Sequence, residues 1–511
     1  MALFILAGCG TLPPQAPLPV SSALAPSPDS ALVKIAVAST PGPDLSGFRL
    51  MPLGVYSLEA RMQLAQRAQR SLDLQYYTIE NDTSGRLMFR ALRDAALRGV
   101  RVRLLVDDLY TTHIDEALQA LSSYPNVEVR LFNPFCCARG SNLPTRFAAS
   151  IFDIGRLNHR MHNKLFIADG VMAVAGGRNI GDQYFQRGVV QNFVDMDAFI
   201  VGAVVKDLAN IFDEYWNSPV VRPIESISKP VGTVDERQQR FHDLVTEQTP
   251  DRPVDPPTVD VLGYGPLSED LLEGRLGLIW AKARAFADPP GKLLLKSRDD
   301  AIRSSVTRDV MMSIWAAQSE LVITSPYLIP GPLGIQTIED LRRGDVKITI
   351  LTNSLAATDV PLVHIGYARY RYRMLKAGVD LYELSPVLTQ RGLRLGAFGT
   401  SHGSLHAKTV VIDRRRVFIG SMNLDPRSES QNTELGIFAD SPELAAEVLR
   451  VVNISKLQSA YKVRVNPTGP GLQWLTMDDD GEVILDSEPE SSTWLRLQNM
   501  FLGFFVPEQL L

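Results

Sequence analysis

Two stretches of this chain carry the same reactive side chains in the same order. They are RMHNKLFIADGVMAVAGGRN, residues 160–179, and SLHAKTVVIDRRRVFIGSMN, residues 404–423. Adding 244 to the residue numbers of the first stretch gives the matching residues of the second: His162 and His406, Lys164 and Lys408, Asp169 and Asp413, Gly176 and Gly420, Asn179 and Asn423. Among the glycine and polar positions of this motif, which are the histidine, the lysine, the aspartate, the two adjacent glycines and the asparagine, only Gly177, which corresponds to Ser421, changes type. A constant offset across these identities indicates an internal repeat with one chemical site in each copy.

The spacing within the first copy predicts a strand, a turn and a returning strand. Side chains two residues apart share one face of a strand, so His162 and Lys164 would project the same way, about 7 Å apart. A turn at Asp169-Gly170 would bring Gly177 opposite His162 and leave Asn179 just beyond it. An imidazole, a cation and an amide at one point are suited to binding a phosphate and to attacking it.

Length and composition set broad limits on the fold and on the partners. The chain of 511 residues is long enough for about two large domains with a sizeable core. Hydrophobic residues make up 45% and charged residues 21%, as in ordinary globular proteins. The net charge of −5 gives no basic field for long nucleic acids, although a local basic cleft is compatible with it. We therefore expect no nucleic-acid partner.

The first residues, MALFILAGCG, contain an apolar run that ends in Leu6-Ala7-Gly8-Cys9. This run resembles the lipobox of bacterial lipoproteins and predicts lipidation of Cys9, with residues 1–9 as the remnant of a signal. No Lys or Arg precedes the run, which is shorter than an ordinary signal peptide; a start codon assigned too late would explain both points. The alternative is an ordinary N-terminus of small residues. Residues 10–45 are rich in Pro, Ser and Ala and predict a tether without a packed core.

The remaining cysteines, Cys136 and Cys137, are adjacent. Because a disulfide between neighbours is strained and rare, we expect two thiols that are not bonded to each other. No later segment reaches 18 consecutive apolar residues, so the sequence predicts no transmembrane helix.

Metal chemistry is not expected, and neither is any other cofactor. His159 with His162, and His402 with His406, have spacings seen among metal ligands on helices. However, His159 corresponds to Gly403, so the additional histidines are not repeated, and no H-E-x-x-H motif or cysteine pair accompanies them.

Apolar periodicity predicts alternating strands and helices in both parts of the chain. Strands are expected at 71–77, 100–109, 126–134, 320–327, 345–355 and 379–386, and helices at 85–99, 114–123, 273–287 and 368–379. We divide the chain into a first half at 46–218, a connector and insertion at 219–300, a second half at 301–465 and a C-terminal tail at 466–511. Two homologous α/β halves are the simplest architecture.

The tail ends in SSTWLRLQNMFLGFFVPEQLL, which spaces its bulky apolar residues as a helix does. These residues are Trp494, Leu497, Phe501, Phe504 and Phe505. The pattern is typical of an amphipathic helix at a lipid boundary and equally of a C-terminal helix packed on the core. Its polar face carries too little positive charge to decide between the two.

The doubled H-x-K-x-x-x-x-D pattern followed by G-[GS]-x-N resembles the phospholipase D superfamily, and the match extends over most of the chain from about residue 50. Four sequence segments are similar to the cardiolipin synthase branch, notably its periplasmic lipoprotein-like type: NHRMHNKLFIADG, GGRNIGDQYF, FDEYWNS and GSMNLDPRSESQNTEL. The resemblance implies two phospholipase D-like α/β halves, each with a mixed sheet flanked by helices, and an active site at their interface.

The resemblance also implies a division of labour between the two histidines. His162 would attack phosphorus to form a phosphohistidine, while His406 would protonate the departing alcohol and then activate the incoming hydroxyl. The near-symmetric motifs do not themselves tell which histidine attacks. The remaining polar side chains would bind the phosphoryl oxygens: Lys164, Lys408, Asn179 and Asn423.

Each histidine needs a carboxylate that fixes its tautomer. Behind His406 the natural candidate is Glu434, which also matches the family's downstream carboxylate. For His162 the counterpart lies in NFVDMDAFI, where Asp195 fits the family position and Asp197 shares its strand face.

The motif aspartates Asp169 and Asp413 sit beside the predicted turns, and we expect them to orient the hairpins rather than transfer protons. Three arginines near the first motif, Arg156, Arg160 and Arg178, would either bind a lipid head-group phosphate or be solvated at the surface.

We therefore expect a phosphatidyltransferase with phospholipid substrates, held at a membrane surface on the periplasmic side of a bacterial cell envelope. The donor would be phosphatidylglycerol or phosphatidylethanolamine, and transfer to phosphatidylglycerol would give cardiolipin. The alternatives are a phospholipase D-type hydrolase, a periplasmic nuclease of the same superfamily and a non-catalytic lipoprotein scaffold. The sequence predicts no particular oligomeric state.

Overall fold

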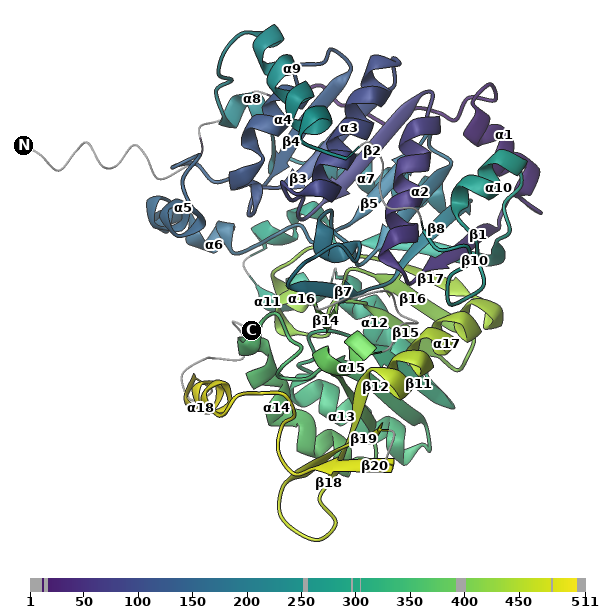
Figure 1. Ribbon diagram of the computed structural model, residues 1–511, viewed down its shortest axis with the longest axis vertical. Helices are drawn as coiled ribbons and strands as arrows, with labels where there is room; N and C mark the ends of the chain where they lie inside the picture. Colours follow the sequence, from purple (N-terminus) through teal and green to yellow (C-terminus); the bar gives the residue numbers. More distant parts are fainter. Residues whose placement is uncertain are drawn as a thin grey trace, which may run out of the picture.

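The computed structural model describes residues 12, 17–250, 256–295, 297–303, 305–391, 401–478 and 481–502. It consists of two α/β halves, the first shown above the second in Figure 1. Cys9, Phe504 and Phe505 lie outside the described residues.

One mixed sheet of 18 strands runs through both halves. The first half contributes, in spatial order, β9 (Val221–Pro223), β4 (Val127–Phe132), β3 (Arg101–Asp107), β2 (Ser71–Tyr76), β5 (Leu165–Ala168), β6 (Met172–Gly176), β8 (Asp197–Gly202) and β1 (Ser46–Met51). The sheet continues through β10 (Ile279–Ala287), β17 (Leu435–Asp440), β16 (Arg416–Gly420), β15 (Thr409–Ile412), β11 (Glu320–Thr324), β12 (Lys347–Asn353), β13 (Asp380–Leu384), β18 (Ala460–Val465), β19 (Leu472–Asp478) and β20 (Gly481–Leu485). The strands β2, β3 and β4 are parallel, as are β11, β12 and β13.

The strand order is the same in the two halves, which confirms the predicted pair of α/β units. The strands predicted in both halves are present, as β2, β3, β4, β11, β12 and β13. The two repeated hairpins match residue for residue, since adding 244 to the bounds of β5 and β6 gives those of β15 and β16.

Helices cover the outer faces of the sheet and fill the space between the halves. The outer helices of the first half are α1 (Ala31–Ser39), α2 (Gly54–Arg67), α3 (Thr83–Leu97) and α4 (Asp115–Leu121). The tether predicted at 10–45 is therefore wrong for α1, because Leu32 and Ala36 are buried in the core of this half. Those of the second half are α12 (Val306–Trp315), α13 (Gly331–Arg343) and α14 (Pro361–Lys376). A central core joins inner-face residues of both halves with α7 (Val204–Trp216) and α17 (Pro442–Gln458). The halves are therefore held together by shared apolar burial as well as by the sheet.

The predicted helix at 85–99 is α3, and its ends follow from local chemistry. The Asp82 side chain accepts a hydrogen bond from the Gly85 N–H (2.9 Å), which satisfies a free donor of the first turn. After the last turn, Gly99 takes a positive φ of 87°, a conformation that glycine adopts without strain.

The predicted helix at 273–287 is wrong. Only Glu273 is helical, as the last residue of α10 (Leu267–Glu273). Ile279–Ala287 form β10, which pairs with β1 on one side and β17 on the other. The physical reason is that burial alternates along this segment, as it does in a strand. Ala281 and Ala285 are buried, whereas Lys282 and Arg284 between them are exposed, and the many apolar residues hide this alternation in the sequence. Part of the connector is thus the strand that joins the two halves.

The C-terminal tail adds structure to the second half. Strands β19 and β20 extend its sheet, and the predicted terminal helix is α18 (Thr493–Leu502), which lies against α14. Asn499 Nδ2 donates to Pro361 O (3.4 Å), while Trp494 and Leu497 are 74% and 49% exposed. The helix therefore packs on the protein with one side and presents large apolar side chains on another.

The turn predicted at Asp169-Gly170 is present, with positive φ at both residues and a hydrogen bond from Val171 N to Ala168 O (3.1 Å). The predicted register is wrong by one residue. Ala168 pairs with Met172 and Leu165 with Ala175, because Val171 also belongs to the turn. If the strands continued in this register, Arg178 rather than Gly177 would lie opposite His162.

The motif aspartates anchor these hairpins to the strand next to them. Asp169 accepts hydrogen bonds from the backbone N–H groups of Gln69, Arg70 and Ser71, at 2.8–3.1 Å. In the second half Asp413 does the same for residues 318–320, at 2.7–3.1 Å. These contacts support the structural role expected of both.

Replacing Asp169 by Ala should destabilise the protein by about 2–4 kcal/mol, since it leaves backbone donors in a buried place without an acceptor. Asp413→Ala should cost about 1 kcal/mol, because its contacts lie nearer the surface. Urea unfolding measures both. Equal decreases in the free energy of unfolding in the two variants would contradict this role. So would a loss of turnover in Asp169→Ala protein that remains folded.

Candidate active site

Backbone pairing between the halves positions both histidines. Strand β7 (Gln191–Val194) of the first half runs parallel to β14 (His402–Leu405) of the second, and the His406 N–H donates to Val194 O (2.8 Å). On the other side Met161 pairs with Thr433, and the His162 N–H donates to Thr433 O (2.8 Å). Figure 1 shows β7 and β14 between the two halves. Each histidine thus lies beside the residue that precedes a carboxylate of the opposite half.

The histidine–carboxylate pairs are crossed. His162 Nδ1 lies 2.9 Å from Glu434 Oε2, and His406 Nδ1 lies 2.6 Å from Asp195 Oδ2. The predicted assignment, Glu434 behind His406 and Asp195 for His162, is therefore wrong, although the two carboxylates are the expected ones. Its physical reason is the pairing just described, which brings Thr433 and Val194 alongside the histidine segments of the other half.

Asp197, the alternative to Asp195, has other partners. It accepts hydrogen bonds from Ser57 Oγ (2.6 Å) and from Arg61 Nη2 (3.0 Å), and both of these side chains are fully buried. Asp195 is accordingly the carboxylate at the histidine, and Asp197 fixes α2 against the sheet.

The carboxylates also determine which ring nitrogen faces a substrate. An ionised carboxylate only accepts hydrogen bonds, so each Nδ1 carries the proton and each Nε2 keeps its lone pair. Glu434 is held further by the hydroxyls of Ser421 and Ser428, which both donate to it.

The single difference between the two motifs fits the difference between the carboxylates. A Cβ on Gly177 would lie 2.1 Å from Asp195 Oδ1, so only glycine admits this aspartate. At the matching position Ser421 contacts the longer Glu434 through its hydroxyl.

Burial and the neighbouring lysines keep both imidazoles neutral. Burial, together with the positive charge of Lys164, lowers the pKa of His162 to about 4. Burial and the charge of Lys408 lower the pKa of His406 to about 3. Burial acts to raise the pKa of Glu434, but His162 and Lys164 outweigh it, so that this carboxyl stays ionised. Both histidines are thus bases at neutral pH.

The two lysines are buried beside the histidines of their own motifs. Lys164 Nζ donates to His162 O (2.6 Å), and Lys408 Nζ donates to His406 O. Burial lowers the pKa of Lys164 well below its ordinary range and that of Lys408 to about 8. Each lysine also lowers the pKa of the histidine in the other motif, so the two motifs share one electrostatic site.

The two asparagines differ in their hydrogen bonds. Asn179 Nδ2 donates to the Tyr184 hydroxyl (3.0 Å), and its Oδ1 accepts from Thr78 N (3.3 Å). Asn423 Oδ1 is buried and has no hydrogen-bond partner within the described part of the chain. Asn423 therefore retains polar capacity inside the protein.

Aromatic rings enclose the histidines, which sequence reasoning missed. Tyr77 packs edge-on against His162, with ring centroids 5.2 Å apart, and Phe193 lies 4.9 Å from His406. Tyr77 is the last residue of the predicted strand 71–77, and Phe193 lies two residues before Asp195, so their positions in strands beside the motifs were the available signal.

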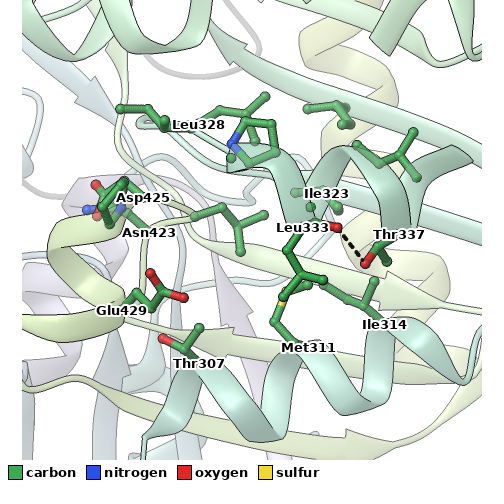
Figure 2. A pocket seen from close by; sticks show the side chains of 18 of the residues that line it. Thr307, Met311, Ile314, Ile323, Leu328, Leu333, Thr337, Asn423, Asp425 and Glu429 are labelled. Atoms are coloured by element: carbon green, nitrogen blue, oxygen red, sulfur yellow. Dashed lines mark hydrogen bonds between the residues drawn. The ribbon is translucent and has the colours of Figure 1, made fainter. Parts of the chain in front are cut away.

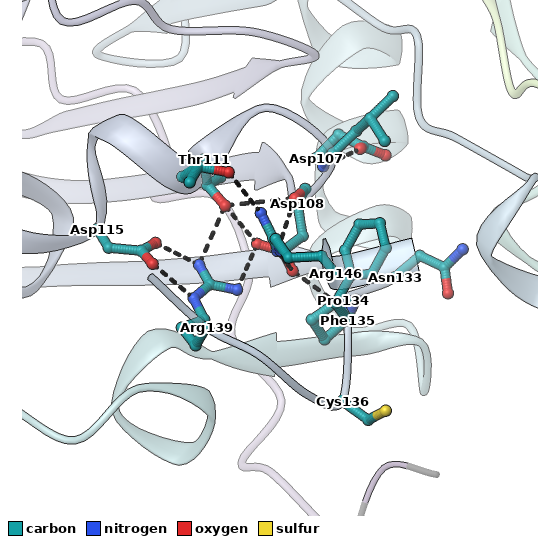
Figure 3. A network of polar contacts seen from close by, with 12 residues as sticks. Asp107, Asp108, Thr111, Asp115, Asn133, Pro134, Phe135, Cys136, Arg139 and Arg146 are labelled. Carbon is teal, nitrogen blue, oxygen red and sulfur yellow. Dashed lines mark hydrogen bonds and ion pairs between the residues drawn. The ribbon is translucent and has the colours of Figure 1, made fainter. Parts of the chain in front are cut away.

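Asp107 was also missed. Its carboxylate accepts from Met161 N (2.8 Å) and from Arg160 Nη1 (3.0 Å), and thereby fixes the residue before His162. Figure 3 shows Asp107 beside Asp108, which forms ion pairs with Arg139 and Arg146. An Asp-Asp pair at the carboxyl end of the strand predicted at 100–109 was a detectable signal.

The three arginines near the first motif bind within the protein. Arg160 and Arg178 are fully buried, and Arg178 donates to the carbonyls of Met51 and Tyr184, among others. Arg156 is partly buried and donates to Pro134 O and to Asp153. Arg160 and Arg178 therefore neither bind a lipid head group nor lie solvated at the surface. They stabilise the backbone instead.

Cys136 and Cys137 are partly exposed, and no disulfide joins them, as predicted.

The comparisons with known proteins agree with this geometry. A family model described as cardiolipin synthase, phospholipase D-like domain matches residues 62–216 and 310–453, one segment in each half. Cardiolipin synthase C of Escherichia coli is 40% identical over 460 residues, which are 88% of this chain and 93% of that protein. Cardiolipin synthase A of Pseudomonas fluorescens is 25% identical over 403 residues, 78% of this chain and 66% of that protein.

Among solved structures, the phosphatidylserine synthase of Haemophilus influenzae has the same fold. The TM-score is 0.57 at 13% identity, with 91% of this chain and 95% of that chain covered. Two matched domains, a relative at 40% identity and the doubled motif together show that the chain belongs to the cardiolipin synthase family of the phospholipase D superfamily.

Proposed function

We propose that this phospholipase D superfamily phosphatidyltransferase makes cardiolipin through a covalent phosphohistidine. The donor is phosphatidylglycerol or phosphatidylethanolamine, and the acceptor is a second phosphatidylglycerol. The observation that supports this proposal best is the crossed pair of histidine–carboxylate contacts, His162 with Glu434 and His406 with Asp195.

In the first step Nε2 of His162 attacks the donor phosphorus, and the bond to the head-group oxygen breaks. The neutral imidazole is a competent nucleophile because Glu434 stabilises the positive charge that develops on the ring. His406 protonates the departing oxygen. An anionic phosphodiester between the rings favours the protonated form of His406, which its low pKa disfavours in the free protein.

In the second step the hydroxyl of the acceptor gives its proton to His406 and attacks the phosphohistidine. The new phosphodiester forms as the bond to His162 breaks, which restores both histidines. Throughout, Lys164, Lys408 and the motif asparagines would neutralise the phosphoryl oxygens.

We place the enzyme at a membrane surface, where its substrates are concentrated. Among the described residues, no helix combines the length and the apolar character needed to span a bilayer. The proposed attachment is the lipid on Cys9, assisted by the exposed Trp494 and Leu497 of α18, on the periplasmic side of the envelope.

Incubation with labelled phosphatidylglycerol tests the function. We expect cardiolipin and glycerol from the wild-type protein, and a loss of at least about 10³-fold in His162→Ala and His406→Ala. Phosphatidic acid alone would instead identify a hydrolase, inertness toward lipid with DNA cleavage a nuclease, and unchanged activity of the two variants a different site.

A phosphodiester with an activated leaving group distinguishes the roles of the two histidines, because the leaving group departs without protonation by an acid. His406→Ala should then accumulate a phosphohistidine on His162, detected by mass spectrometry of rapidly quenched protein, since the acceptor is no longer activated. An adduct on His406 in His162→Ala protein would reverse the roles.

The same substrate tests the crossed pairs. Glu434→Gln should slow adduct formation by about 10²-fold or more, whereas Asp195→Asn should leave it nearly unchanged and slow the breakdown of the adduct. The opposite pattern is the result expected if each carboxylate served the histidine of its own half.

The pKa of Lys408, about 8, predicts a pH dependence of anion binding. Above pH 8 this lysine loses its positive charge, so the Kd for sulfate, which does not titrate in this range, should increase by up to about tenfold per pH unit. Lys408→Met should weaken binding at pH 7 and flatten this dependence. Isothermal titration at constant ionic strength measures it, with the surface variant Lys462→Met as control; a Kd that does not change between pH 7 and 9 contradicts the assignment.

A further inference from the structure

A cavity of about 370 Å³ lies between α12, α13 and the sheet of the second half. Figure 2 shows Met311 and Ile314 of α12 on one wall and Leu333 and Thr337 of α13 on the other. Most of the remaining lining is also apolar, with Ile323 on β11 among its residues. The volume lies in the range of small-molecule sites.

Apart from the threonines of α12 and α13, the polar side chains that line the cavity gather at one end. They are Asn423, Asp425 and Glu429, which Figure 2 places together, away from α13. Burial raises the pKa of Asp425 to about 7, so this carboxyl is partly neutral at neutral pH. No lysine, arginine or histidine is among the lining residues within the described ranges. The long part of the cavity therefore favours hydrocarbon over a second anion.

Hydrogen bonds link the polar end of the cavity to the candidate active site. Asn423 belongs to the second motif, and its backbone N–H donates to Ser428 Oγ (3.2 Å). Ser428 in turn donates to Glu434 Oε1 (2.8 Å), the carboxylate that contacts His162. The unpartnered Oδ1 of Asn423 lies in the same buried region. A ligand that has its phosphate at the histidines and its apolar part in the cavity would therefore pass Asn423.

The cavity belongs to the second half. In the first half the equivalent helices α2 and α3, which precede and follow β2 as α12 and α13 flank β11, pack against each other. In the second half, Trp315 Nε1 of α12 donates to the Thr337 hydroxyl of α13 (2.7 Å), and this hydroxyl donates to Leu333 O within its own helix (3.0 Å). The surface beside the cavity is apolar: Leu333, which lines the cavity, and Trp315 at the end of α12 are 60% and 46% exposed.

The geometry points to a binding site for one acyl chain of the donor phospholipid, with the donor phosphate at the histidines. This inference rests on the proposed function. It means that the protein selects its donor by chain length as well as by head group, since every methylene that leaves water for the cavity strengthens binding by about fourfold.

Release of the head-group alcohol measures the donor step whichever acceptor follows. With phosphatidylglycerols whose two chains range from hexanoyl to palmitoyl, kcat/KM of the wild-type protein should increase with chain length. Met311→Trp fills the cavity and should lower the ratio of long-chain to short-chain kcat/KM by about tenfold. The matched control is Met312→Trp, whose side chain is 53% exposed and outside the cavity, and which should keep the wild-type ratio. Equal ratios in the two variants overturn the inference.

A second measurement does not depend on turnover. A phosphatidylglycerol with a diazirine in one acyl chain should, on irradiation with the full-length protein, label peptides from 306–315 and 331–343, and Met311→Trp should reduce this labelling. If the wild-type protein releases no glycerol from any donor, the proposed function fails, and labelling alone decides: label in α12 and α13 supports the chain site, and label elsewhere refutes it.

Discussion

The active site depends on hydrogen bonds exchanged between the two halves. His162 is held by the backbone of Thr433 and the side chain of Glu434, and His406 by the backbone of Val194 and the side chain of Asp195. Each motif therefore supplies a base whose orientation and charge are controlled by the other half. The central apolar core and the strand β10, which pairs with both β1 and β17, keep the halves in the position that these short contacts require.

The electrostatics follow from the same arrangement. Burying two lysines and two carboxylates separately would cost desolvation free energy. In a common site their opposite charges attract one another and offset part of this cost. The histidines remain neutral, with pKa values of about 4 and 3, while the carboxylates that orient them stay ionised. An incoming phosphodiester brings the negative charge that the protonated rings and lysines can use. The free protein is thus prepared for an anion rather than for catalysis on a neutral group.

Much of this could be predicted from the sequence, because local patterns report local structure. The offset of 244 identified the halves, the hairpins β5–β6 and β15–β16, and the residues that meet at the site. The same patterns carry no information on docking between halves, so the carboxylates were identified but assigned to the wrong histidines. The strand β10 was mistaken for a helix because small alanines make an alternating pattern look uniformly apolar. The burial of Arg160 and Arg178 also depends on distant carbonyls that no local pattern specifies.

The parallel pairing of β7 with β14 has a consequence for the ancestry of the chain. Since neither half contains both members of a histidine–carboxylate pair, a solitary ancestral unit would have needed a second copy to complete either pair. After fusion of two copies, each histidine would still depend on the carboxylate of the other repeat. A substitution beside one carboxylate would then be selected through its effect on the histidine of the other repeat. The glycine at position 177 and the serine at position 421 record how far such copies can diverge while each still accommodates its own acid.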